Sequence, residues 1–496
     1  MLNKIILLVF ALLVIVSGIY ALRDDKEYTT SSDEAHQLFL ESEDLVYKLY
    51  FMESNDKLHQ ALELDSNFAM ALITLAQRNH MYGHTEKRDE LVERAMAQYD
   101  RLKDHEKAYI DIVRSSFGND PEEVHSLIKK YVERFPDRVE GHNFLAISYW
   151  ERGEIKQAIE EYEKLLEIDP DFTPAYNHLG YLEYSNGNFN KALRHFDKYL
   201  QLLPDQANPH DSRGEILMAV GRYDEALDEF KTAYQIEPQF DFVLYHMAEA
   251  YMAKGMYSKA DQIFRKIKDL TRETQDSLNL MVNKGRSYWR RWDPEMARTM
   301  ADSLYRFAEK RETVDAARFW GDMIHGFAYL LEDDYDKAEE YLNNARKFTG
   351  DSGEKNDLES SVNYVGWVEL LQAYISMGRE NYEDVLVLED LLDNRQFWRP
   401  DQKIDTRNIL AQAYLKLGQK DKAFSLVQEN LDLNPNHSYT LITLARLYEW
   451  DGQTEKAVET LRNILTGVYA NADQDTPRIE KLQEKLAELS PQAAGL

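Results

Sequence analysis

The chain has 496 residues, of which 88 are Asp or Glu and 59 are Lys or Arg, so its formal net charge is −29. Such an acidic surface disfavours nucleic acid and anionic membranes as partners for the body of the protein. The absence of cysteine excludes disulfides, cysteine nucleophiles and thiolate metal sites. Length alone would suggest about three globular domains, although a repeat array can reach this size as one continuous stack.

An apolar segment at the N-terminus, within residues 1–22, indicates export. Lys4 precedes an apolar stretch at residues 5–22, and Asp24 and Asp25 follow it. The short apolar core and the small residue Ala21 fit a cleavable signal peptide. The alternative is an uncleaved anchor, because the stretch is only slightly shorter than the roughly 20 residues that span a bilayer. In either case the flanking charges place the remaining chain outside the cytoplasm, periplasmic or secreted, and membrane contact is expected only through residues 5–22 if they are retained.

The segments that follow are expected to be a linker and a set of worn repeats. Residues 23–32 are polar, which favours a short linker. Residues 33–138 show helical apolar spacing with a blurred period, so we expect divergent helical repeats there. Three residues near the end of this stretch stand 34 positions before their counterparts in the next one: Val124, Tyr131 and Pro136.

Residues 139–272 repeat with a period of 34 and without insertion or deletion. Each of the four blocks carries a small residue, a glycine seven positions later and an alanine five positions after that. A period of this length predicts a solenoid of stacked repeats. The three series are Ala146, Gly180, Gly214 and Ala248; Gly153, Gly187, Gly221 and Gly255; and Ala158, Ala192, Ala226 and Ala260.

One block can be divided into two helices from its apolar spacing. A first helix ends at Gly187, where glycine provides a C-terminal cap. A second helix is predicted at residues 189–202, because Pro204 cannot continue it. A short turn makes the two helices antiparallel. We expect small residues at Gly180 and Ala192 because the helices meet there.

This pattern over residues 139–272 closely resembles the tetratricopeptide repeat. The resemblance implies an all-α fold, a right-handed superhelical solenoid of helix-turn-helix repeats. It also implies that the first helix of each pair lines a concave groove in which peptides or protein segments usually bind. The chain lacks the lysine and asparagine set with which some family members clamp a C-terminal carboxylate, so capture of chaperone tails is disfavoured.

The spacing loosens after the regular block. Residues 273–403 are predicted to form repeats with longer loops, in which Gly285 and Ala297 keep the twelve-residue separation. Residues 404–471 restore two regular repeats. Residues 472–496 are expected to form a polar-backed helix that caps the open end of the array, followed by a tail. The prediction is one continuous array of roughly eleven or twelve units.

The sequence carries no recognised catalytic motif. It lacks G-x-S-x-G, G-x-G-x-x-G, a phosphate-binding glycine loop and H-E-x-x-H. Four histidines fall in successive first helices, but the ligands of one metal ion must converge within roughly 2 Å of it and these belong to different units. We therefore expect core or groove contacts for the histidines, and no enzymatic activity, cofactor or metal. The four are His142, His178, His210 and His246.

Helical spacing indicates which side chains face the groove. In the regular block they form a mixed aromatic, amide and acidic surface that includes Trp150, Asn177, Tyr181, Tyr184 and Tyr245. Further along, positive charge and aromatic groups appear in the same register, at Arg286, Trp289, Arg290, Trp320 and Phe327. Arginine and aromatic side chains often dominate binding interfaces. We therefore predict that these ten residues bind a protein segment.

Two interpretations of the looser segment stay open. It is either a binding face, or a region where the superhelix closes on itself, so that Trp320 and Phe327 become core and Arg286 pairs with a groove carboxylate such as Glu249. The function that fits best is a non-catalytic scaffold or adaptor that holds a protein segment or peptide outside the cytoplasm. A membrane-tethered ligand sensor is the second hypothesis, and an enzyme with an unrecognised site in the loosened segment is the third. The sequence gives no indication of the partner's identity or of the oligomeric state.

Overall fold

The computed structural model describes residues 27–48, 50–118, 120–240, 242–270, 274–310, 314–349, 362–393 and 400–490. Over these ranges the regular secondary structure is helical and contains no strand, and the helices follow one another in repeats, which confirms the all-α solenoid. The signal peptide or anchor predicted at residues 5–22 lies outside them. In the described ranges, no helix has both the length and the apolar character needed to cross a bilayer.

The chain divides into two compact units, which we describe separately. Unit 1 runs to Asn186 and includes Arg194–Pro204, whereas unit 2 comprises Gly187–Leu193 and the chain from Asp205 onward. The boundary falls inside the regular block at residues 139–272, and helix α11 (Phe189–Leu202) is divided between the units. The regular repeats at residues 139–272 are therefore shared between the two compact units and do not form a unit of their own.

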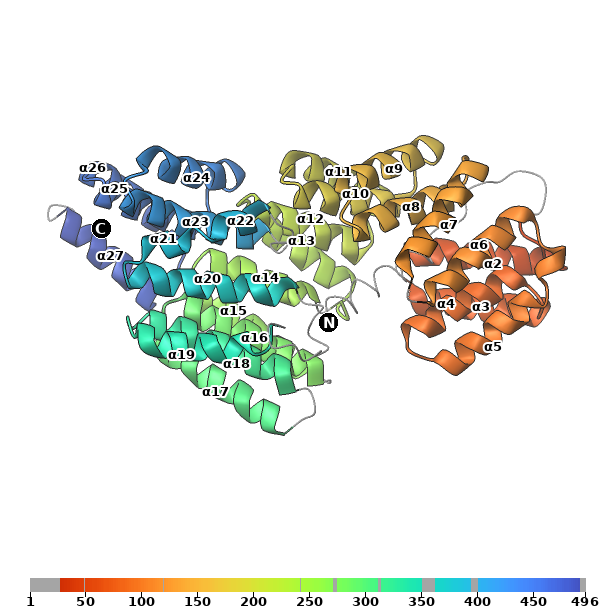
Figure 1. Cartoon of the computed structure of the whole chain (residues 1–496), viewed down its shortest axis with the longest axis horizontal. Coiled ribbons are helices and arrows are strands. Elements are labelled where there is room, and N and C mark those ends of the chain that lie inside the picture. The colour runs from red at the N-terminus through yellow and green to blue at the C-terminus, as the bar shows by residue number, and fades with distance from the viewer. Residues whose placement is uncertain are drawn as a thin grey trace. The chain divides into compact units, whose positions relative to one another are not determined.

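Unit 1 consists of antiparallel helix pairs joined by short turns (Figure 1). The divergent repeats expected at residues 33–138 are helix pairs like those of the regular block. Even-numbered helices are the first members of these pairs, and odd-numbered helices are the second. The helices are α2 (Asp33–Tyr47), α3 (Phe51–Leu64), α4 (Ala69–Met81), α5 (Thr85–Met96), the short η1 (Tyr99–Arg101), α6 (Asp104–Ser116), α7 (Pro121–Arg134), α8 (Val139–Glu151), α9 (Ile155–Ile168) and α10 (Thr173–Ser185).

The recurring small residues make room for aromatic rings. A Cβ added at Gly180 would lie 2.4 Å from an atom of the Phe196 ring, and one added at Gly214 would lie 2.4 Å from an atom of the Phe230 ring. Each ring belongs to the second helix of its own pair. We expected Gly180 to face Ala192, whereas the atoms closest to its position are those of Phe196. The small residue is needed because a bulky ring fills the space between the two helices.

The first helix of unit 1 reaches across to the fifth pair. The Tyr47 ring, at the end of α2, meets the Phe172 ring edge-on at 5.1 Å between centroids. Tyr47 also shares a core cluster with Ile147 of α8. Helix α4 is enclosed, since residues 69–79 are all buried. The interior of unit 1 is therefore filled by its own side chains.

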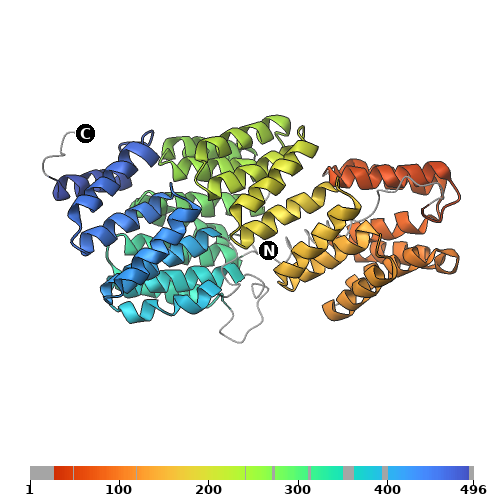
Figure 2. The ribbon, with the colours of Figure 1, turned by 90° about the horizontal axis from the view of Figure 1, so that it is seen from above.

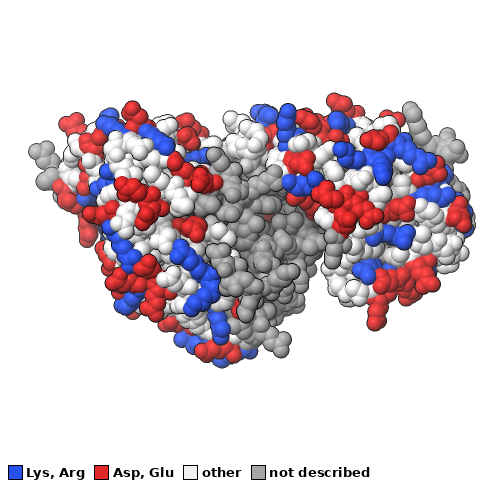
Figure 3. Space-filling view, in the orientation of Figure 1, with Lys and Arg blue, Asp and Glu red and all other residues white. Residues whose placement is uncertain are grey.

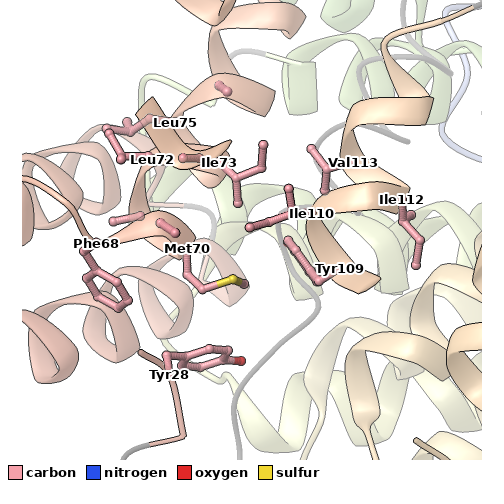
Figure 4. Packing of buried hydrophobic residues seen from close by; sticks show 14 of the residues in the cluster. Tyr28, Phe68, Met70, Leu72, Ile73, Leu75, Tyr109, Ile110, Ile112 and Val113 are labelled. Carbon is pink, nitrogen blue, oxygen red and sulfur yellow. The ribbon is translucent and has the colours of Figure 1, made fainter. Parts of the chain in front are cut away.

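Residues 27–31 pack against these helices, which differs from the linker expected at residues 23–32. The Tyr28 side chain is 3% exposed, and its ring centroid lies 5.3 Å from that of Phe39 in α2. Figure 4 shows Tyr28 beside Phe68 and Met70 in the same apolar cluster. The sequence conceals this contact because polar residues surround the single aromatic anchor.

Unit 2 continues the succession of helix pairs to the end of the described chain (Figure 1). The last helix appears where the sequence predicts it. The helices are α12 (Ala207–Ala219), α13 (Tyr223–Ile236), α14 (Phe242–Ala253), α15 (Tyr257–Leu270), α16 (Thr274–Arg290), α17 (Pro294–Glu309), α18 (Val314–Leu330), α19 (Tyr335–Arg346), α20 (Val362–Gly378), α21 (Tyr382–Val385), α22 (Leu388–Asp393), α23 (Pro400–Lys416), α24 (Lys420–Leu433), α25 (Ser438–Trp450), α26 (Thr454–Asn463), the short η3 (Ile464–Val468) and α27 (Pro477–Leu489).

The looser repeats keep the left-handed turn without its glycine. Gly221 and Gly255, at turns of the regular block, have φ values of 79° and 69°. The residues at the same place in three later pairs have φ values of 60°, 57° and 62°; they are Trp292, Asp333 and Glu380. A side chain in this conformation costs roughly 1–2 kcal/mol. The packing of these helix pairs therefore imposes the turn even where the sequence does not favour it.

Unit 2 closes on itself at the turns of its own earlier repeats. The Asn436 side-chain amide donates to the Gly221 carbonyl at 3.1 Å. The Asp473 N–H donates to the Gly255 carbonyl at 3.0 Å. Figures 1 and 2 show the C-terminal helices, in blue, beside the green helices of the same unit. The C-terminal repeats therefore rest on the α12–α13 and α14–α15 turns.

Helix α27 completes this closure. Arg478 is 6% exposed, and its N–H and Nη1 donate to the carbonyls of Arg291 and Arg290 at 3.1 and 3.0 Å. Its guanidinium carbon lies 5.5 Å from the centroid of the Trp292 ring. We expected α27 to cap an open end of the array. It does carry the predicted apolar stripe, but the end is packed against the α16–α17 turn.

Candidate functional site

Three consecutive first helices of unit 2 bring charged side chains to one face. Asp211 and Glu215 stand four residues apart on α12, and His246 and Glu249 stand three apart on α14, spacings that place each pair on one side of its helix. Arg286 of α16 continues the row. We define these five residues as the inner face of unit 2. All but His246 lie in the inward register that helical spacing predicts, and His246 joins them through its contacts with Asp211 and Glu215.

His246 lies between two carboxylates of α12. Its Nδ1 is 2.7 Å from Asp211 Oδ1, and its Nε2 is 3.5 Å from Glu215 Oε1. Burial acts to lower the pKa of His246, but Asp211, Glu215 and Glu249 outweigh this effect and raise the pKa to about 10. The imidazole is therefore protonated at neutral pH, with a carboxylate beside each of its nitrogens.

The same three side chains are close enough to share one metal ion, since their ligand atoms lie within 4.8 Å of one another. Without a metal, each ring nitrogen of His246 faces a carboxylate and the three side chains form a charged network. A metal would have to displace the imidazole proton in order to bind. The sequence analysis treated His246 together with the other histidines and did not identify its partners. The four-residue spacing of Asp211 and Glu215, which places both carboxylates on one side of α12, could have indicated them.

Arg286 joins α16 to the rest of the inner face. Its Nη1 lies 3.8 Å from Glu249 Oε1, and its guanidinium carbon lies 5.4 Å from the centroid of the Trp367 ring. The Arg286 side chain is 13% exposed. This pairing with Glu249 is the one that we expected if the superhelix closes on itself.

Aromatic rings of α16, α18 and α20 form a wall beside Arg286, which we define as Trp289, Trp320, Phe327 and Trp367. Trp289 and Phe327 stack with centroids 4.1 Å apart and planes 26° apart. Trp367 meets both rings edge-on at 6.2 Å. Phe327 is 4% exposed, whereas Trp289 and Trp320 are half-buried. Phe327 is therefore a core residue that supports the Trp289 ring.

The most accessible aromatic side chain beside the inner face is that of Phe242, at the start of α14. It is 60% exposed, and its ring centroid lies 6.4 Å from that of Tyr245, which is half-buried. Both residues lie in the inward register that the sequence predicts, but only Tyr245 was chosen as a candidate. Phe242 differs from the other aromatic residues in its exposure to solvent. The exposure of a side chain depends on contacts between repeats, which the sequence of one repeat does not show.

Four of the predicted binding residues belong to unit 1 and form a separate set. Trp150 is half-buried, with its ring 5.6 Å from that of His178. The Tyr181 ring meets that of Phe196 edge-on at 5.0 Å. The other two, on the same helix as Tyr181, are also half-buried; they are Asn177 and Tyr184.

The remaining predicted residue, Arg290, lies at the closure of unit 2. It is half-buried at the end of α16, where its carbonyl accepts hydrogen bonds from Arg478 and from the Tyr257 hydroxyl. The structure therefore brings together five of the ten candidates around the inner face and its wall: Tyr245, Arg286, Trp289, Trp320 and Phe327. Their role in binding stays a prediction.

The other three histidines of successive first helices lie in separate environments. His142 Nδ1 lies 2.9 Å from Glu161 Oε2, and His210 pairs in the same way with Glu229 at 2.5 Å. The His178 ring stacks on that of Tyr162 at 5.3 Å, and burial lowers the pKa of His178 to about 3. These three therefore act as core or groove contacts.

Comparison with protein families matches four stretches of the chain. Residues 217–281, 177–240 and 404–437 match models described as tetratricopeptide repeat, and residues 148–187 match a model described as TPR repeat. The matched stretches include α12 and α14, which carry most of the inner face. None of the curated proteins matches the chain.

Three solved structures are similar to part of the chain. MamA from residue 41 onward, from Desulfovibrio magneticus RS-1, is 16% identical with a TM-score of 0.32 and covers 34% of this chain and 94% of its own. A second MamA structure is 22% identical, with a TM-score of 0.29 and coverage of 31% and 85%. PilF from Pseudomonas aeruginosa is 18% identical, with a TM-score of 0.34 and coverage of 43% and 97%. Likeness at this level carries no information about function.

Proposed function

Because this chain is a tetratricopeptide repeat protein, we propose that it is a non-catalytic scaffold that binds a segment of another protein on the inner face of unit 2. Repeats of this family generally mediate protein–protein interaction. The observation that carries the proposal is the exposed Phe242 ring, with the half-buried Tyr245 ring next to it, beside a row of charged side chains. Aromatic side chains of this kind contribute much of the binding energy where interfaces form.

The charges of the inner face indicate the chemistry of the segment. The carboxylates of Asp211, Glu215 and Glu249 lie along this face, in contact with His246 and Arg286. The whole chain carries a net charge of −29, and Figure 3 shows Asp and Glu side chains scattered over both units on the face in view. We infer a segment that presents an apolar side chain to the aromatic pair and a basic side chain to the carboxylates.

The surroundings hold the inner face in one arrangement. The stacked rings of Trp289 and Phe327 and the pairing of Arg286 with Glu249 fix α16 against its neighbours. A site that is ordered before binding loses less conformational entropy when the partner arrives. The aromatic wall therefore supports binding even though most of its surface is not available to a partner.

A peptide array tests the proposal with the full-length protein. One set of immobilised peptides combines an apolar residue with a basic neighbour, and a matched set replaces the basic residue by an acidic one. We expect binding to the basic set, and a loss of at least about tenfold in affinity for Phe242→Ser, the size expected for an interface anchor.

Met52→Ser is the matched control, because Met52 is 75% exposed and lies in unit 1. This variant should bind the peptides as the wild type does. Equal binding to the basic and acidic sets, or equal losses in the Phe242 and Met52 variants, would count against the inner face as the site.

We also propose that the protein works outside the cytoplasm. The support is the apolar stretch at residues 5–22 with Lys4 before it and acidic residues after it. Intact-mass analysis of the fractionated protein tests this. A mass without residues 1–21 identifies a cleaved signal peptide, and a full-length mass in the membrane fraction identifies an anchor. A full-length mass in the soluble cytoplasmic fraction contradicts export.

A further inference from the structure

Residues 27–31, which we define as the N-terminal strap, lie across the ends of successive helix pairs in unit 1. Thr29 is held by Glu106 near the start of α6, since its N–H donates to Oε1 at 2.7 Å and its hydroxyl donates to Oε2 at 2.5 Å. The Lys103 N–H donates to the same carboxylate at 2.8 Å. Glu106 is 0% exposed. A buried carboxylate is therefore satisfied largely by the strap.

Asp65, which follows α3, holds the next two residues in a similar way. The Thr30 hydroxyl and the Ser31 N–H each donate to Asp65 Oδ2 at 2.7 Å. Burial acts to raise the pKa of Asp65, but these hydrogen bonds and one from the Asn67 N–H outweigh it and lower the pKa. The strap is recognised through main-chain N–H groups and hydroxyls, as extended peptide ligands commonly are.

Tyr28 is the apolar anchor of the strap. Its ring centroid lies 5.3 Å from that of Phe39 and 5.9 Å from that of His105, and the residue is 3% exposed. Figure 4 shows the ring close to Phe68 and Met70, at the edge of the apolar cluster. One buried aromatic ring followed by main-chain hydrogen bonds is the pattern of a bound peptide, here supplied by the chain itself.

Two carboxylates share one arginine where the strap begins. Arg138 Nη1 donates to Glu27 Oε1 at 2.6 Å and to Glu140 Oε1 at 3.2 Å, so one guanidinium serves two carboxylates. Both are sheltered, with side chains 16% and 6% exposed. Burial raises the pKa of Glu27 and Glu140 adds to this effect, although Arg138 and Lys103 oppose it. Holding Glu27 in its charged form therefore costs desolvation, and the carboxylate shares Arg138 with Glu140.

We propose that this edge of unit 1 is a second peptide-binding site, filled in cis by the N-terminal strap, from which an extended segment of a partner protein displaces it. The segment that fits carries an aromatic residue followed by hydroxyl residues, as Tyr28, Thr29 and Thr30 do. A neutral or basic residue in place of Glu27 fits better, because it adds no second carboxylate beside Arg138. This site is independent of the inner face of unit 2.

Because the strap is part of the same chain, a partner segment must compete with it for the site. A strap joined directly to α2 competes with any partner at an effective concentration in the mM range. A partner segment therefore binds measurably only when the strap is released or when its own residues suit the site better than the strap does. A partner that lacks a carboxylate at the position of Glu27 has that advantage, because it leaves Arg138 to Glu140 and avoids the desolvation of Glu27.

Binding of a labelled peptide to the full-length chain tests the proposal. The probe is a fluorescein-labelled peptide of residues 27–33, and its anisotropy is measured against increasing protein. Tyr28→Ala in the chain removes the anchor of the strap, and Thr29→Pro removes the N–H that reaches Glu106. Tyr82→Ala is the matched control, because Tyr82 is an exposed tyrosine of unit 1, 57% exposed.

We expect both release variants to bind the probe at least about tenfold more tightly than the wild-type and Tyr82→Ala chains. A probe with Glu27→Gln should bind about threefold more tightly than the unchanged probe, and one with Tyr28→Ala should not bind. Folded release variants that fail to bind the probe overturn the proposal. Loss of helical circular dichroism in both release variants overturns it as well, because the strap is then a required part of the core.

Discussion

Glu43 lies in the interior of unit 1, where its Oε1 has no hydrogen-bond partner among the described residues. It is 3% exposed, and burial raises its pKa to about 8, although Arg78 opposes the shift. The carboxyl is therefore mostly protonated at neutral pH. Because the folded-state pKa exceeds the ordinary value of 4.5, the stability contributed by this group is complete below pH 4.5 and is lost as the pH rises to about 8.

We expect Glu43→Gln to remove this pH dependence, because glutamine resembles the protonated carboxyl. The variant should match the wild type near pH 4.5 and exceed its free energy of unfolding by up to roughly 5 kcal/mol above pH 8. Urea unfolding followed by circular dichroism across this range measures the difference. If the two proteins lost stability in parallel as the pH rises, the Glu43 carboxyl would not be the source of the pH dependence.

At the residue scale, the sequence period shows which positions pack against a neighbouring helix, but it does not show which side chain they pack against. The small residues Gly180 and Gly214 were recognised as places of close approach. The rings against them, from Phe196 and Phe230, were not identified as the reason. Spacing along a helix shows which residue faces the neighbouring helix, but the side chain that fills the gap depends on the packing of both helices.

At the scale of helix pairs, the turn of the looser repeats carries backbone strain. Glu380 is exposed and has a φ of 62°. Glu380→Gly removes strain of roughly 1–2 kcal/mol and adds chain entropy to the unfolded state worth roughly 0.5–1 kcal/mol. We therefore expect a net gain of about 0.5–1 kcal/mol in the free energy of unfolding. Thermal and urea unfolding measure it.

Gly418→Glu is the reciprocal control, because Gly418 occupies the same turn position of a regular repeat with a φ of 76°. A Cβ at this position would meet no atom within 4 Å. The loss of stability that we expect for Gly418→Glu therefore comes from backbone strain and not from a steric clash. A stable Gly418→Glu variant, or a weakened Glu380→Gly variant, would show that the turns are not strained.

Helix bounds followed from the sequence where the repeats are regular. The second helix expected at residues 189–202 coincides with α11. In the looser part, α16 and α18 have 17 residues each, whereas α8 of the regular block has 13. The separation of Gly285 and Ala297 still marked the turn between α16 and α17, because close packing across a turn constrains the small residues more than it constrains helix length.

At the scale of unit 2, closure links the C-terminal helices to the middle of the chain. We expect Arg478→Ala to lower the free energy of unfolding by about 2–3 kcal/mol, since it removes a buried hydrogen bond to Arg290 and a cation–π contact with Trp292. Limited proteolysis should then cleave α24–α27 faster than in the wild type. Glu484→Ala, at an exposed residue of the same helix, is the control. Equal cleavage of the two variants would mean that closure contributes little stability.

Closure was one of two interpretations that the sequence left open, but the contacts of the C-terminal repeats that make it were not predicted. The bond from Asn436 to Gly221 joins residues 215 positions apart, and no feature of either repeat points to the other. The inner-face register was predictable, because it follows from the local period of a helix. Which of its aromatics stay accessible was not, since burial of Phe327 and exposure of Phe242 depend on how distant helices pack.

The central claim is that the inner face of unit 2 binds a protein segment. Hydrogen–deuterium exchange of the full-length protein, with and without a saturating peptide of the apolar and basic type, tests it most directly. We predict slower exchange in α12, α14 and α16 when the peptide is present, and unchanged exchange in α2–α5. Unchanged exchange throughout the chain, or protection confined to unit 1, would contradict the claim.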